Sequence, residues 1–120
     1  MRIGIDAMGG DFAPEAVVLG TIKASARVGD STVIVLYGDK EAIGEIFDAN
    51  GGKPDCVEIV HTTEAIAMNE HPTQAFSQKS DSSITVGFRD LTTGAIDGFA
   101  SAGSTGAMMV GCMLAEAARF

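Results

Sequence analysis

Short runs of β-branched and aliphatic residues alternate along this chain with longer stretches whose apolar residues recur at helical spacing. The runs at residues 2–6, 32–37, 57–61 and 97–101 predict four strands. Parallel strands need crossover helices between them, so the alternation predicts a βαβ succession. Residues 32–37 are almost continuously apolar, which is typical of a sheet covered on both faces. The pattern therefore predicts a three-layer α/β/α fold with a mainly parallel, Rossmann-like sheet.

Helix signals lie between and after these strands. We expect helices from Pro14 to about residue 28, from Asp39 to residues 50–52, from Pro72 to about Lys79, from Ser82 or Ser83 to about Gly94, and from residue 107 onward. The fourth of these is open to a second interpretation, because Ile84, Val86 and Phe88 also fit the period of a strand.

The last helix is apolar on every side. Residues 107–115 hold no charged side chain, and a helix of this kind needs cover all round. Residues 100–115 are fewer than the roughly 20 apolar residues that a bilayer core requires, so a buried helix fits better than a membrane span. The sequence also reaches Arg119 and Phe120 without a helix-ending signal. We therefore expect residues 1–120 to be the amino-terminal part of one larger α/β domain.

The charge of the chain limits its partners. Sixteen acidic and 8 basic residues give a net charge of −8, which opposes binding to a nucleic acid backbone. Cys56 and Cys112 have none of the spacings of a zinc site or redox pair, and each lies among apolar residues. These features favour buried, reduced thiols in a cytoplasmic protein.

Two glycine-containing loops leave the ends of predicted strands, at the sheet edge where open α/β folds bind ligands. The first spans residues 6–11 and contains Gly9 and Gly10, which allow close backbone approach and positive φ. A tight turn in which Asp11 caps the next helix is the commoner explanation of such a loop. The second spans residues 101–106 and offers hydroxyls and main-chain amides at a helix start, which suits phosphate. Close packing alone would also explain its glycines.

A third polar segment lies at residues 79–83. Lys79 supplies a positive charge, Asp81 a carboxylate, and the serines a helix cap or anion ligands. Helix capping is the commoner use of such residues. His61 and His71 could act as acid–base groups, but histidines without a recognisable partner in the sequence are more often structural or solvated.

Taken in order, these segments resemble the amino-terminal part of the bacterial phosphate acyltransferases of phospholipid synthesis. The matching stretches are residues 5–11 (IDAMGGD), Ala13-Pro14, Gly38-Asp39, Ser82-Ser83 and residues 101–107 (SAGSTGA). The first and last stretches are specific to the family in combination. Two residues depart from its pattern: Phe12 stands where a histidine is common, and Ser104 where an asparagine is common. Phe12 removes a proton donor from the first loop, whereas Ser104 keeps a hydrogen-bonding group.

The resemblance implies a fold like that of the isocitrate and isopropylmalate dehydrogenases, and phosphorolysis of a long-chain acyl thioester on acyl carrier protein. Positioning and preorganised donors would do this work, without metal or cofactor. It gives Asp81 and Asp11 an orienting, catalytic role. The residues expected to bind phosphate or substrate are Gly9, Gly10, Lys79, Ser82, Ser83, Gly103, Ser104, Thr105 and Gly106.

The same resemblance implies acyl carrier protein and inorganic phosphate as partners and a homodimer as the assembly. Acyl carrier protein is acidic, so a segment with a net charge of −8 would repel it, and we expect docking outside these residues. Any peripheral membrane association would also come from other regions, since no basic amphipathic helix is visible. Two alternatives stay open: an acetyl- or butyryltransferase that uses coenzyme A thioesters, and a non-catalytic anion-binding α/β module.

Overall fold

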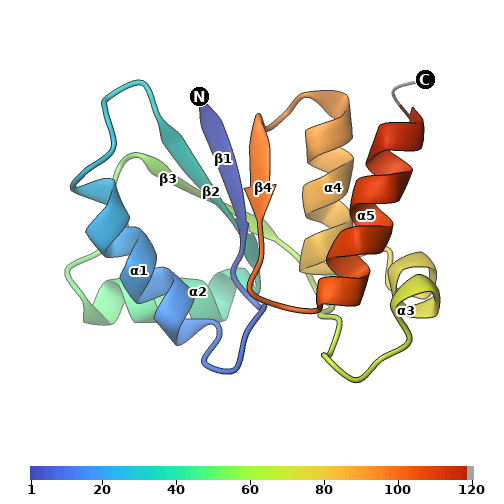
Figure 1. Cartoon of the computed structure of the whole chain (residues 1–120). Coiled ribbons are helices and arrows are strands. Elements are labelled where there is room, and N and C mark those ends of the chain that lie inside the picture. Colours follow the sequence, from blue (N-terminus) through green and yellow to red (C-terminus); the bar gives the residue numbers. More distant parts are fainter. Residues whose placement is uncertain (119–120) are drawn as a thin grey trace.

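Four parallel strands form the centre of the molecule. The computed structural model describes residues 1–118. Strands β1 (Arg2–Asp6), β2 (Val33–Gly38), β3 (Val57–His61) and β4 (Gly98–Ala100) pair in the order β3-β2-β1-β4 (Figure 1). The predicted strands, their parallel pairing and the α/β class are confirmed.

The strand order changes direction at β1, because β2 and β3 lie on one side of it and β4 on the other. All the strands point the same way, so the loops that follow them gather at one edge of the sheet, at the bottom of Figure 1. The loops after β1 and β4 are therefore neighbours, although about 95 residues separate them in the sequence. A crevice at such a switch point is where doubly wound folds bind their ligands.

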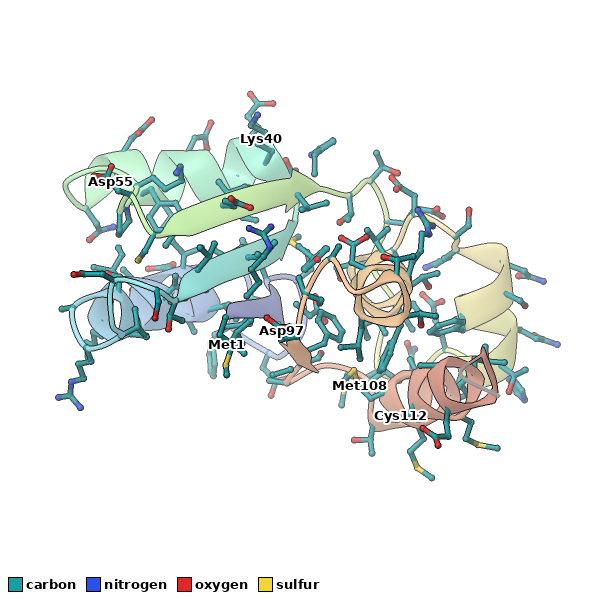
Figure 2. The ribbon with its side chains drawn as sticks, turned by 90° about the horizontal axis from the view of Figure 1, so that it is seen from above. Met1, Lys40, Asp55, Asp97, Met108 and Cys112 are labelled. Atoms are coloured by element: carbon teal, nitrogen blue, oxygen red, sulfur yellow. The ribbon has the colours of Figure 1, made fainter. Side chains whose placement is uncertain are left out.

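Helices α1 (Glu15–Ser25) and α2 (Lys40–Ala49) cover one face of the sheet (Figure 2). Val18 of α1 and Phe47 of α2 pack on Leu36, and all three side chains are almost fully buried. Burying side chains of this size contributes about 1.5–3 kcal/mol each to folding. This cluster fixes the position of α1 and of the loop that precedes it.

Helix α4 (Ser83–Thr93) covers the opposite face. Its Val86 packs in one cluster with Val35 and Tyr37 of β2. The Tyr37 hydroxyl donates a 2.7 Å hydrogen bond to Asp90, and burial with this bond raises the pKa of the Tyr37 phenol. A buried hydroxyl with a partner avoids the desolvation penalty, so this contact ties α4 to the sheet.

Helices α3 (Pro72–Gln78) and α5 (Thr105–Ala118) pack beside α4. Two glycines let α5 approach closely: a Cβ at Gly106 would collide with Pro72, and one at Gly111 with the Phe88 ring. Because glycine has no side chain, the α5 backbone at these two positions can lie directly against Pro72 and Phe88. These contacts fix where α5 begins.

The helix boundaries test several predictions. Asp39 caps α2, Ser82 caps α4, and Gly94 ends α4 with a φ of 83°, so the helical interpretation of residues 83–93 is correct and the strand alternative is wrong. Helix α1 ends at Ser25, before the predicted residue 28. The predicted cap at Asp11 is also wrong, because α1 follows Pro14 without a side-chain cap and Asp11 is exposed.

Helix α5 is buried on one side and open on the other. Ala107 is fully buried, whereas Met109, Met113 and Leu114 are 62, 70 and 54% exposed. The cover expected over this helix stays a prediction, and Arg119 and Phe120 lie outside the described residues. Within residues 1–118, no helix has the length and apolarity needed to cross a membrane.

The prediction of two buried thiols is corrected. Cys56 is half-buried beside the α1/α2 core, and Cys112 is exposed on α5 (Figure 2). Both thiols are free. The apolar neighbours of Cys112 in the sequence misled the prediction, because they belong to the open side of α5.

Candidate functional site

A buried carboxylate joins the two glycine-containing loops. Asp6 ends β1 with 2% of its surface exposed and accepts a 2.7 Å hydrogen bond from the Ser101 hydroxyl of the second loop. Its other oxygen accepts the main-chain N–H of Met8 at 2.9 Å. The Ser101 oxygen in turn accepts the N–H of Gly103 at 2.9 Å. The predicted candidate loops are thus one hydrogen-bonded unit.

The two loops are in contact at Gly9 of the first loop and Gly103 of the second. A Cβ at Gly9 would lie 2.5 Å from Asp6 Oδ2 and 2.7 Å from the Gly103 nitrogen. A Cβ at Gly103 would lie 3.0 Å from the Gly9 Cα atom. Gly10 has a φ of 102°, as the sequence predicted for this loop. Gly9 and Gly103 have no positive φ, and their small size is required by the contact between them.

The start of α5 provides main-chain donors. The Ser104 hydroxyl is buried and accepts the Ala107 N–H at 3.2 Å, which caps the helix. Gly103 gives its N–H to Ser101. On the described part of the chain, the N–H groups of Ser104, Thr105 and Gly106 have no partner. Thr105 is exposed, so its hydroxyl is accessible beside them.

The third candidate segment, residues 79–83, holds polar groups that already have partners. The Lys79 ammonium pairs with Glu70 at 2.6 Å and donates to the Ala65 carbonyl at 2.9 Å. Asp81 accepts both the hydroxyl of Thr63, at 2.6 Å, and its N–H, at 2.9 Å. These two bonds from Thr63 lower the pKa of the Asp81 carboxyl.

Ser82 and Ser83 are both buried at the start of α4. The Ser82 hydroxyl accepts the Thr85 N–H at 3.1 Å and donates to the Thr85 hydroxyl at 2.8 Å. The Ser83 N–H donates to the Glu64 carbonyl at 3.2 Å. No hydrogen bond within residues 1–118 links this segment to the two glycine-containing loops. Its expected part in phosphate binding stays a prediction.

A polar cavity of about 400 Å³ lies at the ends of β2 and β3. Its lining residues are Met8, Asp39, Glu41, His61, Thr62, Thr63, Glu64 and Ala65. The Thr62 hydroxyl is buried and has no hydrogen-bond partner among the described residues, and the His61 Nδ1 atom accepts the Lys40 N–H. Three carboxylates in the lining disfavour an anion here. Among residues 1–118, no group of three or more His, Cys, Asp or Glu side chains could hold a metal ion.

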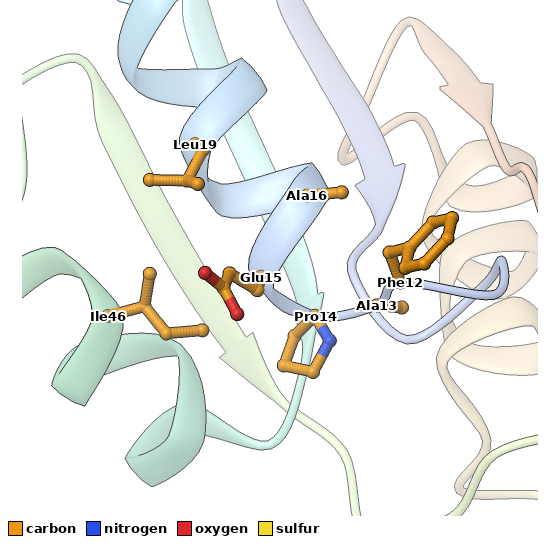
Figure 3. A pocket seen from close by; sticks show the side chains of 7 residues that line it. All are labelled: Phe12, Ala13, Pro14, Glu15, Ala16, Leu19 and Ile46. Carbon is orange, nitrogen blue, oxygen red and sulfur yellow. The ribbon is translucent and has the colours of Figure 1, made fainter.

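An apolar groove of about 560 Å³ lies between α1 and α2 (Figure 3). The lining residues are Phe12, Ala13, Pro14, Glu15, Ala16, Leu19 and Ile46. Phe12 is 78% exposed, two residues after Gly10, and Leu19 is 36% exposed. This groove was not predicted from the sequence, because it depends on how α1 packs against α2 and leaves Phe12 and Leu19 exposed.

Comparison with known proteins places the chain in a family. Residues 1–118 match the model of a family described as fatty acid synthesis protein. A phosphate acyltransferase from Caldicellulosiruptor bescii is 46% identical over 95% of the chain and 34% of that relative. A phosphate acyltransferase from Thermoanaerobacterium thermosaccharolyticum is 43% identical over 95% of the chain and 32% of the relative. The chain thus spans about a third of the length of these relatives, and it belongs to the fatty acid synthesis protein family.

Proposed function

We propose that this chain contributes the phosphate site of an enzyme that moves an acyl group from acyl carrier protein to inorganic phosphate. The relatives named phosphate acyltransferase support the acyl transfer. The observation that carries the phosphate site is the set of N–H groups at Ser104, Thr105 and Gly106, which have no partner among residues 1–118 and lie beside the loop that contains Gly9 and Gly10.

Main-chain donors at a helix start suit phosphate for two reasons. The N–H groups point along the helix axis at the ligand, and the positive end of the helix dipole favours an anion. The Thr105 hydroxyl adds a donor that can rotate toward a phosphate oxygen. We assign phosphate to these groups and call them the amide cradle.

The reaction needs orientation more than activation, because phosphate at neutral pH is already an anion. A phosphate oxygen attacks the thioester carbonyl carbon, and a tetrahedral oxyanion forms. The C–S bond then breaks, and the proton of hydrogen phosphate passes to the departing thiolate, which leaves acyl phosphate and the free thiol of the carrier. Holding phosphate in line with the carbonyl and stabilising the oxyanion are the tasks of fixed donors.

Asp11 and the segment 79–83 receive supporting roles in this proposal. Asp11 is exposed directly after Gly10, so its carboxylate can orient a substrate that enters above the cradle. Residues 79–83 lie where α4 starts, and their contacts with Thr63, Glu70, Thr85 and Glu64 brace that edge of the sheet. Their support for phosphate would act through this bracing.

The finer assignments of partner and place belong to the same proposal. A carrier protein of acidic character would dock outside this chain, whose net charge is −8. We also assign a homodimer in the cytoplasm, in which other regions of the protein make any contact with a membrane. All of these assignments are compatible with the amide cradle as the phosphate site.

The experiment uses an enzyme of full family length that carries this sequence at its amino terminus. Acyl phosphate formed from acyl carrier protein thioester is trapped with hydroxylamine while phosphate is varied. We expect saturable hydroxamate formation that requires phosphate. If the coenzyme A thioester alone supports turnover, or if no hydroxamate forms with either thioester, the proposed reaction is wrong.

A further inference from the structure

We infer that Asp6 and Ser101 are positioning residues that hold the amide cradle in its working geometry, an inference that rests on the proposed function. They do not face phosphate themselves. Their hydrogen bonds set how the loop after β1 and the loop after β4 lie against each other, and the cradle starts three residues after Ser101.

The burial of Asp6 shows how firmly this contact is made. A carboxylate with 2% of its surface exposed is costly to bury unless its oxygens are hydrogen-bonded. Both oxygens are: Oδ1 accepts the Met8 N–H and Oδ2 accepts the Ser101 hydroxyl. Each bond comes from a different loop, so the carboxylate connects them. If the loops separated, an acceptor with a full charge would lose its partner.

Ser101 transmits this constraint to the cradle. Its hydroxyl gives its only proton to Asp6, so its oxygen is left to accept the Gly103 N–H. The direction of both hydrogen bonds is thereby fixed: the Gly103 N–H donates to Ser101, and the Ser101 hydroxyl donates to Asp6. The Gly103 amide is turned inward toward Ser101, and the next three amides remain without a partner on the described part of the chain.

The glycines leave the loops little room for another arrangement. The Gly9 Cα atom would lie 3.0 Å from a Cβ at Gly103, and Gly9 has no space for a Cβ of its own. Contact between the two main chains prevents a closer approach, and the hydrogen bonds through Asp6 prevent separation. We therefore expect loss of the Ser101 hydroxyl to loosen the site without unfolding the protein.

The test compares Ser101→Ala, Ser101→Thr and a control, Asp39→Ala, in the same full-length enzyme. Asp39 caps α2 through the N–H groups of Glu41 and Ala42, so its loss removes side-chain-to-backbone bonds elsewhere at this sheet edge. Steady-state kinetics with phosphate and thioester varied separately, melting temperatures, and phosphate binding by calorimetry are measured on each variant.

We expect Ser101→Ala to raise the KM for phosphate by about tenfold, with a parallel loss in calorimetric affinity, since about 1.4 kcal/mol is a factor of ten. The KM for thioester should stay within about twofold, and Ser101→Thr should restore phosphate binding because it returns the hydroxyl. Asp39→Ala should lower the melting temperature and leave the phosphate KM unchanged.

Two results would overturn the inference. One is a Ser101→Ala enzyme with a lowered melting temperature and an unchanged phosphate KM, which would make the Asp6–Ser101 contact purely structural. The other is a Ser101→Thr enzyme as impaired as Ser101→Ala, which would attribute the loss to something other than the hydroxyl. A wild-type enzyme that binds phosphate but forms no acyl phosphate would refute the proposed reaction alone, because the calorimetric comparison would still hold.

Discussion

The glycine-containing loops and the segment 79–83 use similar residue types in opposite ways. In the loops, one buried carboxylate organises the backbone, and the amides of Ser104, Thr105 and Gly106 remain without a partner within residues 1–118. In the segment, Lys79 pairs with Glu70, and Asp81 accepts a hydrogen bond from the Thr63 hydroxyl. Polar residues that saturate one another brace a fold, whereas unpaired main-chain donors are ready for a ligand.

The strongest test of the difference between the loops and the segment adds one carbon atom where the two loops are in contact. Gly9→Ala places a Cβ 2.5 Å from Asp6 Oδ2 and 2.7 Å from the Gly103 nitrogen, so the two loops must move apart. We expect a loss of about 1–3 kcal/mol in the free energy of unfolding, as for other overpacked sites, and near-complete loss of phosphate-dependent turnover. Chemical denaturation and the hydroxamate assay measure the two effects.

Gly20→Ala is the matched control for that change. Gly20 lies inside α1, and a Cβ there meets nothing within 4 Å. The same substitution should raise the free energy of unfolding by about 0.5–1 kcal/mol, because alanine loses less conformational entropy in a helix. A Gly9→Ala protein as stable and active as the Gly20→Ala protein would show that the loops are not in close contact.

A smaller change tests the ligand-facing side of the loops. Thr105→Val keeps the shape of the side chain and removes the hydroxyl beside the free amides. We expect the phosphate KM to rise about tenfold, the effect of one lost hydrogen bond to a charged group. Thr93→Val, at the far end of α4, should leave phosphate kinetics as they are. Equal kinetics in the two variants would remove the Thr105 hydroxyl from the site.

A substitution in the segment 79–83 should have little effect on phosphate kinetics. Lys79→Gln removes the ion pair with Glu70 and keeps a group able to donate to the Ala65 carbonyl. Because ion pairs between partly exposed side chains contribute little, we expect a slightly lower melting temperature and a phosphate KM within about twofold of wild type. A tenfold rise in the phosphate KM would instead make Lys79 a phosphate ligand and would erase the contrast.

The smallest predicted effect is an acid titration in the segment. Hydrogen bonds from Thr63 lower the Asp81 pKa, so the stabilising effect of its carboxylate is complete above the ordinary aspartate pKa of about 3.9 and is lost as the pH falls through the lowered value. Thr63→Val should raise the Asp81 pKa, since only the N–H bond remains. Carboxyl-carbon NMR titration measures it, and an unchanged midpoint would contradict the Thr63 contact.

The sequence predicted the fold well because its signals are local. Apolar runs marked the strands, and Asp39, Ser82 and Gly94 marked helix ends by chemistry that acts within a few residues. The glycine-containing loops were found because parallel strand ends share one edge. What escaped depends on long-range contacts: the Asp6–Ser101 bond spans 95 residues, and a Cβ at Gly9 would meet Gly103 and Ser101 from the other end of the chain as well as Asp6.

The partners of Lys79 and the exposure of Cys112 escaped because both depend on how helices lie. Lys79 and Glu70 flank α3 and pair across it, and the apolar neighbours of Cys112 do not reveal which side of α5 is covered. Burial and pairing are properties of the packed chain. They could be predicted only together with the arrangement of α3, α4 and α5.

The amide cradle is built from groups that do not titrate. Ser104, Thr105 and Gly106 keep the same charge at every pH at which a protein stays folded, so acid or base cannot switch these donors off. The pH profile of phosphate capture at the cradle should therefore follow the ionisation of the ligand, with the dianion favoured over the monoanion near neutrality. These donors also do not distinguish phosphate from other tetrahedral oxyanions of similar size, so sulfate, vanadate and arsenate should compete for the site.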